Sequence, residues 1–210
     1  MKKYLITIIL FLQIFDGNSA DFQKYFPRLI SLEGVMFTVT QYDKGGATKY
    51  GITYETFKLW CNGKMVEIAP CDRDNDQKVT INDLRLTVLY DVKPIYETYY
   101  WDKVMADEID SQGIAELFVD LTINSGVGYK NCHIKALQDI VEVVADGKMG
   151  PQTLNAVNTG NQTIIYNSLY RYRKNYYRKI SHRKHQKKFL KGWLYRISHL
   201  KQIHSHEKLI

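Results

Sequence analysis

The 210-residue sequence has only three cysteines, and their spacing fits no known zinc-binding pattern, which excludes a zinc finger or ribbon. Cys61 and Cys71 bracket a short loop and are expected to pair if the protein folds in an oxidising compartment; otherwise all three remain thiols. Cys132 lies among apolar residues and is expected to be a buried thiol of the core.

The sequence also lacks a long apolar run at its N-terminus, where the apolar stretch after Lys2 and Lys3 covers only residues 4–15. This run is shorter than the roughly 20 apolar residues that cross a bilayer. Its position and flanking charges are typical of a secretory signal over residues 1–20, with cleavage expected after Ala20. We therefore expect a periplasmic or secreted protein with no stable membrane insertion after cleavage; the alternative is an uncleaved anchor.

Acidic residues are nearly absent from the last fifty positions, where 13 Lys and Arg face a single acid, Glu207. Residues 1–160 carry 16 Lys and Arg against 21 Asp and Glu. Such a basic end predicts an anionic partner, which is nucleic acid, lipid headgroups or the carboxylates and phosphates of a cell wall. For an exported protein the wall is favoured. The alternative is a solvated helix face, and residues 199–210 are expected to be a frayed basic tail.

The composition, 45% hydrophobic and 24% charged, is that of a globular protein. Apolar spacing and capping residues predict a mainly α fold, with one short strand near residues 37–41. Pro151 is expected at the first position of a late helix. The first expected helix lies within residues 21–33, where Pro27 either begins the helix or kinks it. The other expected helices cover residues 53–60 capped by Thr53, residues 87–100 capped by Thr87, and a stretch that begins at Ser111.

A carboxylate pair follows the first of these helices. Glu33 ends the helix, and Asp43 lies ten residues later in a glycine turn that continues to Thr48 and to Gly51-Ile52-Thr53. Glycoside hydrolysis needs one carboxylic acid to protonate the leaving oxygen and a second group to handle water or positive charge. A helix C-terminus and an apolar wall both raise the pKa of a carboxyl group, as a general acid requires. The alternative is a surface carboxylate next to an ordinary turn.

These residues resemble the signature of the bacterial N-acetylmuramidases of glycoside hydrolase family 108. From Asp43 to Thr53 every motif position is kept, while Val35-Met36 stand where the family usually has Gly-Tyr. The resemblance implies a lysozyme-like helical fold that cleaves the β-1,4 bond between N-acetylmuramic acid and N-acetylglucosamine without a cofactor. It implies that Glu33 is the general acid. Asp43 would stabilise the positively charged transition state or orient the attacking water, and Thr48 would position that water.

Two further segments extend the resemblance. Asp120 and Asn124 share a helix face within a segment similar to the family's Asp-x-x-x-Asn-Ser-Gly, which implies substrate binding; a helix-end cap is the alternative. The hydrolase region covers residues 21–128 on this basis. The turn from Asp146 to Thr153 resembles the predicted peptidoglycan-binding region that accompanies it, implying a helical C-terminal subdomain over residues 129–198. A plain turn into a helix would have the same pattern.

An acidic loop at residues 72–83 forms a separate motif within the hydrolase region. Carboxylates lie at the first, third, fifth and twelfth positions, and the seventh offers a backbone carbonyl, as in an EF-hand-like calcium loop. Gln77 replaces the usual glycine, and aspartate at the twelfth position is similar to dockerin-like loops. We expect weak binding of a structural calcium ion, with an Asx-rich surface turn as the alternative. The expected ligands are Asp72, Asp74, Asp76, Lys78 and Asp83.

The sequence therefore predicts an exported peptidoglycan hydrolase whose partner is peptidoglycan. A non-catalytic wall-binding protein on the same fold is the alternative. Alternating basic and aromatic residues near the C-terminus also suit a nucleic-acid-binding protein. The signal-like N-terminus and the Glu33–Thr53 motif argue against nucleic acid as a partner, and the sequence gives no indication of oligomeric state.

Overall fold

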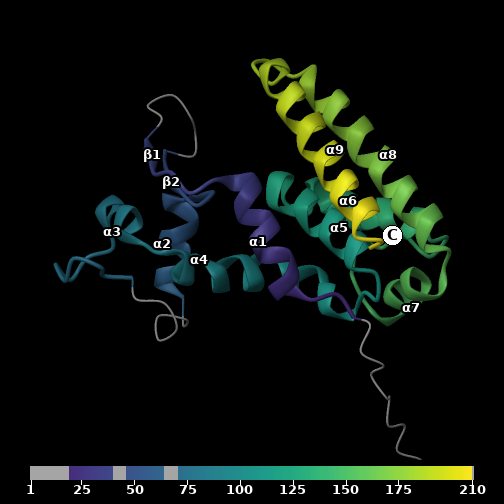
Figure 1. Cartoon of the computed structure of the whole chain (residues 1–210), viewed down its shortest axis with the longest axis horizontal. Helices are drawn as coiled ribbons and strands as arrows, with labels where there is room; N and C mark the ends of the chain where they lie inside the picture. Colours follow the sequence, from purple (N-terminus) through teal and green to yellow (C-terminus); the bar gives the residue numbers. More distant parts are fainter. Residues whose placement is uncertain (1–18, 40–45, 64–70, 210) are drawn as a thin grey trace, which may run out of the picture.

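The computed structural model describes residues 19–39, 46–63 and 71–209, and over these residues the fold is mainly helical, as the sequence predicts (Figure 1). Most of the signal-like segment and Asp43 lie outside the described residues. The elements are α1 Phe22–Glu33, β1 Thr38–Val39, β2 Ala47–Lys49, β3 Ile52–Thr53, α2 Tyr54–Asn62, α3 Ile81–Leu86, α4 Leu89–Tyr96, the π-helical turn η1 Glu97–Trp101, the short 3₁₀ turns η2 Asp102–Val104 and η3 Ala106–Glu108, α5 Gln112–Ser125, η4 Tyr129–Asn131, α6 Cys132–Ile140, α7 Pro151–Thr159, α8 Gln162–Ser181, η5 Lys187–Phe189 and α9 Leu190–His206.

Local capping sets where several helices begin. The side chain of Asp21 accepts a hydrogen bond from the backbone N–H of Gln23 at the start of α1. Thr53 and Ser111 cap α2 and α5 in the same way, and Pro151 is the first residue of α7. The starts at Thr53, Ser111 and Pro151 confirm the sequence predictions, while α1 begins at Phe22 and contains Pro27 instead of starting there.

The helix predicted to begin at Thr87 begins two residues later. The Thr87 hydroxyl donates to the carbonyl of Leu84 and thereby ends α3. The Asp91 carboxylate accepts from the N–H of Val88 at 2.8 Å, so α4 is capped from within its own first turn. The helix then widens into the π-helical turn η1 after Tyr96. The prediction was wrong because a threonine that can cap the following helix can equally terminate the preceding one.

The small sheet lies beside α1 and contains two strands that the sequence analysis did not expect. Its antiparallel order is β1–β2–β3, with Thr48 of β2 opposite both Thr38 and Thr53. A tight turn at Tyr50 and Gly51, both with positive φ, joins β2 to β3. The motif that carries Thr48 and Gly51 is thus a β-hairpin that folds back towards the end of α1.

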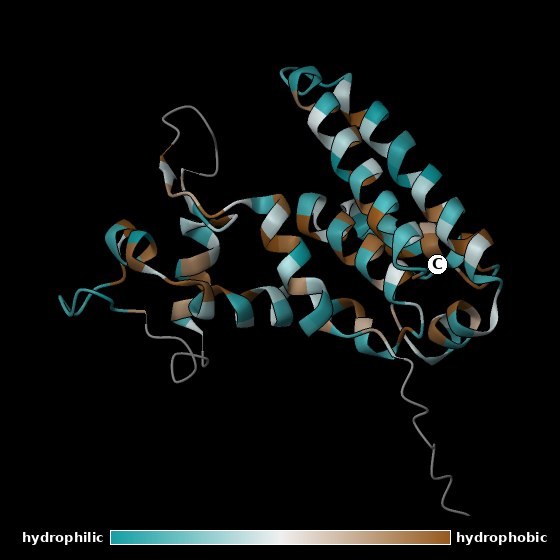
Figure 2. Cartoon of the chain, viewed as in Figure 1, coloured by the Kyte–Doolittle hydropathy of each residue, from teal (hydrophilic) through white to brown (hydrophobic). Residues whose placement is uncertain are grey.

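Helix α5 is the central element of the core. Every residue from Gln112 to Thr122 is buried, and α5 packs against α8 and α9, which form an antiparallel hairpin (Figure 1). One continuous cluster of buried apolar side chains extends from α1 through α5 to α8. Apolar residues lie on the inward faces of the outer helices and polar residues on their outward faces (Figure 2). None of the helices in the described part of the chain is long and apolar enough to cross a membrane.

The expected frayed tail is instead the second half of α9. His204 is fully buried, with its ring nitrogens 3.0 Å from Glu116 Oε2 and 2.8 Å from the Tyr166 hydroxyl. Beyond the helix, the carbonyl of Leu209 accepts a hydrogen bond from the N–H of Gly113 at 3.0 Å. A side chain at position 113 would collide with that carbonyl, so a glycine at the start of α5 lets the end of the chain dock there.

Cys61 and Cys71 are joined in a disulfide that ties the end of α2 to the start of the acidic loop. Both residues are buried. Cys132 is a free thiol and is only half-buried, so the expectation of a core thiol was wrong. It lies at the first position of α6, at the wall of a surface hollow rather than in the apolar core.

Candidate active site

Glu33 is the last residue of α1, where Gly34 ends the helix with a positive φ. Its side chain is 17% exposed, so the carboxylate is largely shielded but still reachable from solvent. Oε1 accepts a hydrogen bond from Nη2 of Arg196 at 2.7 Å. Arg196 lies on α9, which brings the two ends of the chain together at this carboxylate.

Gly51 of the β2–β3 turn lies directly against the other side of Glu33. A Cβ at position 51 would be 2.7 Å from Glu33 Oε2 and 2.5 Å from the hydroxyl of Tyr96, closer than real side chains approach. The φ of +77° also favours glycine. The Tyr96 hydroxyl donates to the carbonyl of Tyr50 at 2.9 Å and so fixes the turn. The hairpin motif therefore meets the helix-end carboxylate through a position that only glycine fits.

Asp120 of α5 is the buried centre of the network behind Glu33. It has no exposed surface and forms ion pairs with Arg173 of α8 and with Arg196. Nε of Arg196 lies 2.9 and 3.0 Å from the two Asp120 oxygens, and Tyr25 donates to the same carboxylate at 3.3 Å. Asp120 thus anchors the guanidinium that contacts Glu33.

The two carboxyl groups of this network have opposite pKa shifts. Burial raises the pKa of Glu33, and the Arg196 guanidinium opposes that rise without cancelling it. Burial would also raise the pKa of Asp120, but Arg196 and Arg173 outweigh it and hold the pKa well below its usual range. Burial, followed by the charge of Glu33, raises the pKa of the Tyr96 and Tyr100 hydroxyls. Glu33 is therefore the group suited to carry a transferable proton, while Asp120 remains ionised.

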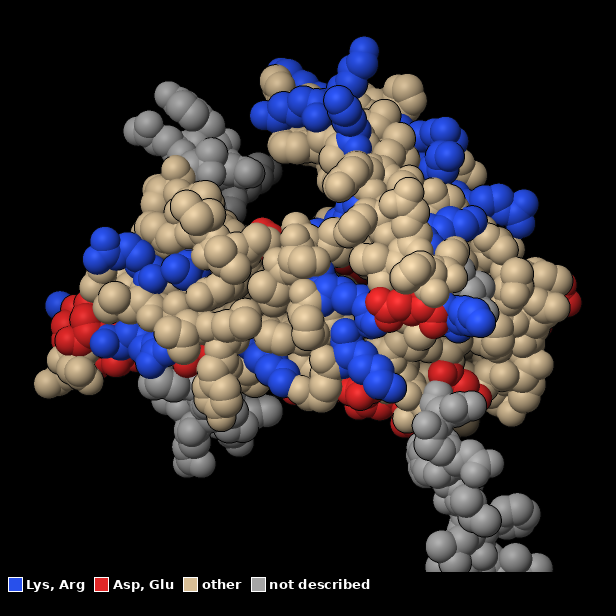
Figure 3. All heavy atoms as spheres, viewed as in Figure 1, with Lys and Arg blue, Asp and Glu red and all other residues tan. Residues whose placement is uncertain are grey.

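A surface hollow of about 320 Å³ adjoins Arg196. Asn124 lines it, and its amide donates to the Asp120 backbone carbonyl at 2.8 Å. Figure 3 shows the surface hollowed between the α8–α9 hairpin and the part of the molecule that carries the sheet. Of the two predicted substrate-binding residues, Asn124 is at the surface and Asp120 lies behind Arg196. Their roles in substrate binding stay predictions.

Thr48 lies on β2, half-buried, three residues before Gly51. The structure thus brings Thr48 onto the hairpin that contacts Glu33. Its predicted role in positioning water, like the role of Asp43, stays a prediction.

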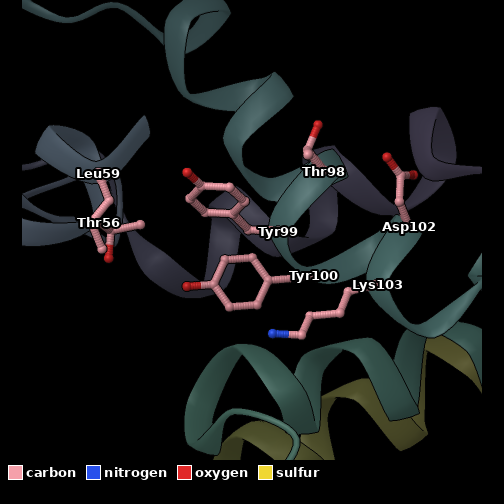
Figure 4. Close-up of a pocket in the computed structure, with 7 residues that line it drawn as sticks. All are labelled: Thr56, Leu59, Thr98, Tyr99, Tyr100, Asp102 and Lys103. Atoms are coloured by element: carbon pink, nitrogen blue, oxygen red, sulfur yellow. The ribbon is translucent and has the colours of Figure 1, made fainter. Parts of the chain in front are cut away.

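A second hollow, of about 590 Å³, lies between α2 and η1 (Figure 4). Tyr99 and Tyr100 project into it opposite Thr56 and Leu59, and Asp102 and Lys103 lie at its side. Burial raises the pKa of the mostly exposed Asp102, with Asp107 adding to the effect. Within the described residues this hollow has no buried carboxylate held by a cation, so Glu33 is the stronger candidate for acid chemistry.

The acidic loop places three of its predicted ligands together. Carboxylate oxygens of Asp72, Asp74 and Asp76 lie within 4.8 Å of one another. Asp76 N–H donates to Asp72 at 3.0 Å, and Lys78 N–H donates to Asp76 at 2.9 Å. Gln77, which stands where the usual glycine would be, has a φ of +65°, so the loop makes the expected turn despite the missing glycine.

Asp83, the fourth predicted carboxylate ligand, contacts the loop through backbone N–H groups. It is fully buried, and its oxygens accept hydrogen bonds from the N–H groups of Arg73 at 2.6 Å and Thr80 at 2.7 Å. Burial would raise the pKa of Asp83, but these hydrogen bonds lower it. The structure gives Asp83 the role of capping α3 and closing the loop, and its predicted role as a metal ligand stays a prediction.

Sequence reasoning missed Arg196, Arg173 and Tyr96. Arg196 lies 163 residues from Glu33, and nothing in the basic C-terminal pattern separates it from the exposed cations around it. The one available signal was Gly51, since a glycine at a fixed offset in the motif indicates a close backbone approach.

Comparisons with known proteins show what the chain is similar to. A family model described as glycosyl hydrolase 108 matches residues 26–126, and a model described as a predicted peptidoglycan domain matches residues 133–198. Among solved structures, SagA of Brucella abortus is 29% identical, with a TM-score of 0.66 over 86% of this chain and 91% of that one. No curated protein sequence matches the chain.

Proposed function

Because the chain belongs to the glycosyl hydrolase 108 family and carries a predicted peptidoglycan domain, it is a glycoside hydrolase acting on peptidoglycan, and we propose that it is an exported N-acetylmuramidase. In this proposal it cleaves the β-1,4 bond between N-acetylmuramic acid and N-acetylglucosamine with Glu33 as the general acid. The observation that carries the proposal is the largely shielded Glu33 carboxyl group, with its raised pKa, held between Arg196 and Gly51.

The mechanism uses the proton on Glu33. Glu33 gives this proton to the glycosidic oxygen as the bond between that oxygen and the anomeric carbon breaks. Positive charge develops on the sugar, and water adds to the anomeric carbon. We assign Asp43 to stabilise that charge or accept the proton of the water, and Thr48 to position the water. Arg196, fixed by Asp120, holds the Glu33 carboxyl group in one orientation.

The products of digestion test this proposal. Peptidoglycan is incubated with the protein, new reducing ends are reduced with borohydride, and the fragments are analysed by mass spectrometry. We expect reduced N-acetylmuramic acid at the new ends. Reduced N-acetylglucosamine would assign the cleavage to the other glycosidic bond.

A wall-binding protein without catalysis is the second candidate. It is favoured by Val35 and Met36, which replace the usual family residues two and three positions after Glu33 and are 53% and 74% exposed. Complete absence of released fragments, together with retention of the protein on the wall, would support this candidate over the muramidase.

We expect Arg196→Gln to move the alkaline limb of the pH–rate profile to higher pH. Arg196 lowers the pKa of Glu33, whereas burial and Asp120 raise it, so removing the cation lets the pKa rise further. The acid form of Glu33 then persists to higher pH. The profile of kcat/KM for solubilised glycan strands measures this shift, and Arg171→Gln, an exposed arginine on α8, is the control. An alkaline limb that stays in place would mean that another group controls it.

We also propose that the acidic loop binds a structural calcium ion. Asp72, Asp74 and Asp76 fit the ion because their oxygens converge, whereas Asp83 is engaged by backbone N–H groups. A bound ion would offset the mutual repulsion of the three carboxylates and brace the loop between the disulfide and α3. It takes no part in the proposed chemistry.

Calcium is accordingly expected to raise the melting temperature, since a ligand bound only by the folded state stabilises it, by about 2.7 kcal/mol at 100 times its Kd. Asp74→Ala with Asp76→Ala should abolish this increment. Glu108→Ala with Asp139→Ala removes two exposed acids elsewhere and should leave the increment intact. Thermal unfolding with millimolar calcium or with chelator measures the change in melting temperature. Identical unfolding curves for the wild type under the two conditions would mean that the loop is a plain surface turn that binds no calcium.

A further inference from the structure

A row of three adjoining hollows begins at Arg196 and follows the α8–α9 hairpin. The hollow beside Arg196 adjoins one of about 500 Å³, with Asn124 and Trp193 in the walls of both. That hollow adjoins another of about 620 Å³, and the two share Ser125, Tyr176 and Arg183. We call these three adjoining hollows the hairpin groove.

The hairpin groove is basic. Lys179, Arg183, Lys184 and Arg196 line it, and none of the residues described as lining its three hollows is an aspartate or glutamate. Within the described part of the chain, the side chains of Lys179, Arg183 and Lys184 form no ion pair or hydrogen bond, unlike that of Arg196. Figure 3 shows Lys and Arg gathered at the end of the hairpin. These three cations are therefore available to an anionic ligand.

Aromatic, apolar and uncharged polar side chains form the rest of the groove, and one wall is held in place by hydrogen bonds. Tyr172 and Tyr176 stack with ring centroids 6.4 Å apart. His133, buried behind them, is 3.0 Å from the Ser125 hydroxyl and 2.8 Å from the Tyr172 hydroxyl. Burial, with Arg173 adding to it, lowers the pKa of His133 to about 4, so the imidazole is neutral near neutral pH. The wall is thus ordered before any ligand binds.

We propose that the hairpin groove binds the peptide stem of the muramic acid at the cleavage site, through the carboxylates of that stem. The inference rests on the proposed muramidase function. The stem is attached to the same sugar whose glycosidic bond is cleaved, so it must leave the active site close to Glu33. The groove begins at Arg196, which contacts Glu33, and leads to the three unpaired cations.

Charge distinguishes the stem from the glycan strand as the ligand. The two sugars are uncharged once the lactyl group of muramic acid is joined to the peptide, so the negative charges of the polymer repeat are the carboxylates of its stem. A basic groove with no acidic lining complements those carboxylates, and its tyrosines suit the short apolar side chains of the peptide.

Binding of a soluble muropeptide tests the inference. N-acetylmuramoyl-tetrapeptide, and the same molecule with its carboxylates amidated, are titrated into the whole protein by calorimetry. We expect the charged form to bind, and Arg183→Glu with Lys184→Glu to weaken it at least about tenfold, which corresponds to ~1.4 kcal/mol. Lys187→Glu with Lys188→Glu is the matched control, because these exposed lysines follow in the same connection, make the same change in charge and do not line the groove.

Each result decides the question. No binding of the charged muropeptide, equal affinity for its amidated form, or equal losses in both double variants would overturn the inference. Tighter binding of a single-stranded oligonucleotide, lost in Arg183→Glu with Lys184→Glu alone, would reassign the groove to nucleic acid. Hydrolysis of peptidoglycan by the wild type is measured in parallel: a protein that cuts the wall without binding the muropeptide refutes only the stem site, and one that cuts nothing refutes the muramidase.

Discussion

Glu33→Gln is expected to lower the rate of peptidoglycan hydrolysis by about 10² or more, the usual contribution of a positioned general acid. The amide has the shape of the carboxyl group but cannot release a proton to the glycosidic oxygen. Its carbonyl oxygen can still accept the hydrogen bond from Arg196, which now meets Glu33 Oε1 at 2.7 Å, so the fold and the neighbouring ion pairs should be preserved. The release of reducing ends from purified wall measures the loss.

Two controls make this result specific. Glu55→Gln changes an exposed carboxylate in the first turn of α2 and should leave the rate unaltered. Sedimentation with insoluble wall should show that Glu33→Gln still binds, because the proposed stem site is left intact. Near-normal turnover by Glu33→Gln would remove Glu33 from the mechanism.

Asp120→Asn is expected to destabilise the protein by roughly 3–5 kcal/mol, because it removes the charge that pairs with two arginines. Arg173 has no exposed side-chain surface and Arg196 only 12%, so neither guanidinium can recover its hydration in the folded state. Denaturant unfolding measures the free energy. Glu207→Gln removes a carboxylate that is 41% exposed and pairs with Arg28, and it should cost about 0–1 kcal/mol.

The pH dependence of unfolding gives a separate test. The folded-state pKa of Asp120 is depressed, so its stabilisation is fully present above the unfolded pKa, near 3.8, and is lost only as the pH falls towards the folded pKa. The difference in stability between the wild type and Asp120→Asn should therefore be constant from neutral pH down to about the unfolded pKa and shrink below it. A variant as stable as the wild type at neutral pH would show that Asp120 is not the anchor of the network.

The local features of this protein were predictable from its sequence. Thr53, Ser111 and Pro151 begin helices because a cap or a proline acts on residues within one turn of itself. Thr87 was assigned to the wrong helix because a threonine between two helices can hydrogen-bond in either direction. The two strands of the motif hairpin were missed because two or three residues are too few to show an alternating pattern.

Glu33 and its motif were recognisable because the chemistry requires particular residue types at fixed offsets along the chain. The sequence likewise predicted a basic surface near the C-terminus and a loop in which acidic side chains converge. Each of these depends on residues that are close in sequence.

Only the tertiary structure decided how the site is held together. Arg196 reaches Glu33 across 163 residues, Arg173 reaches Asp120 across 53, and the end of the chain docks on Gly113 instead of fraying. The packing of α1, α5, α8 and α9 decides which of these distant residues meet. The free energy of that packing is shared among many buried side chains. No pattern within one helix indicates which of several similar arginines will face inward. The sequence therefore singled out Glu33 as the proposed acid without indicating that Arg196 contacts it.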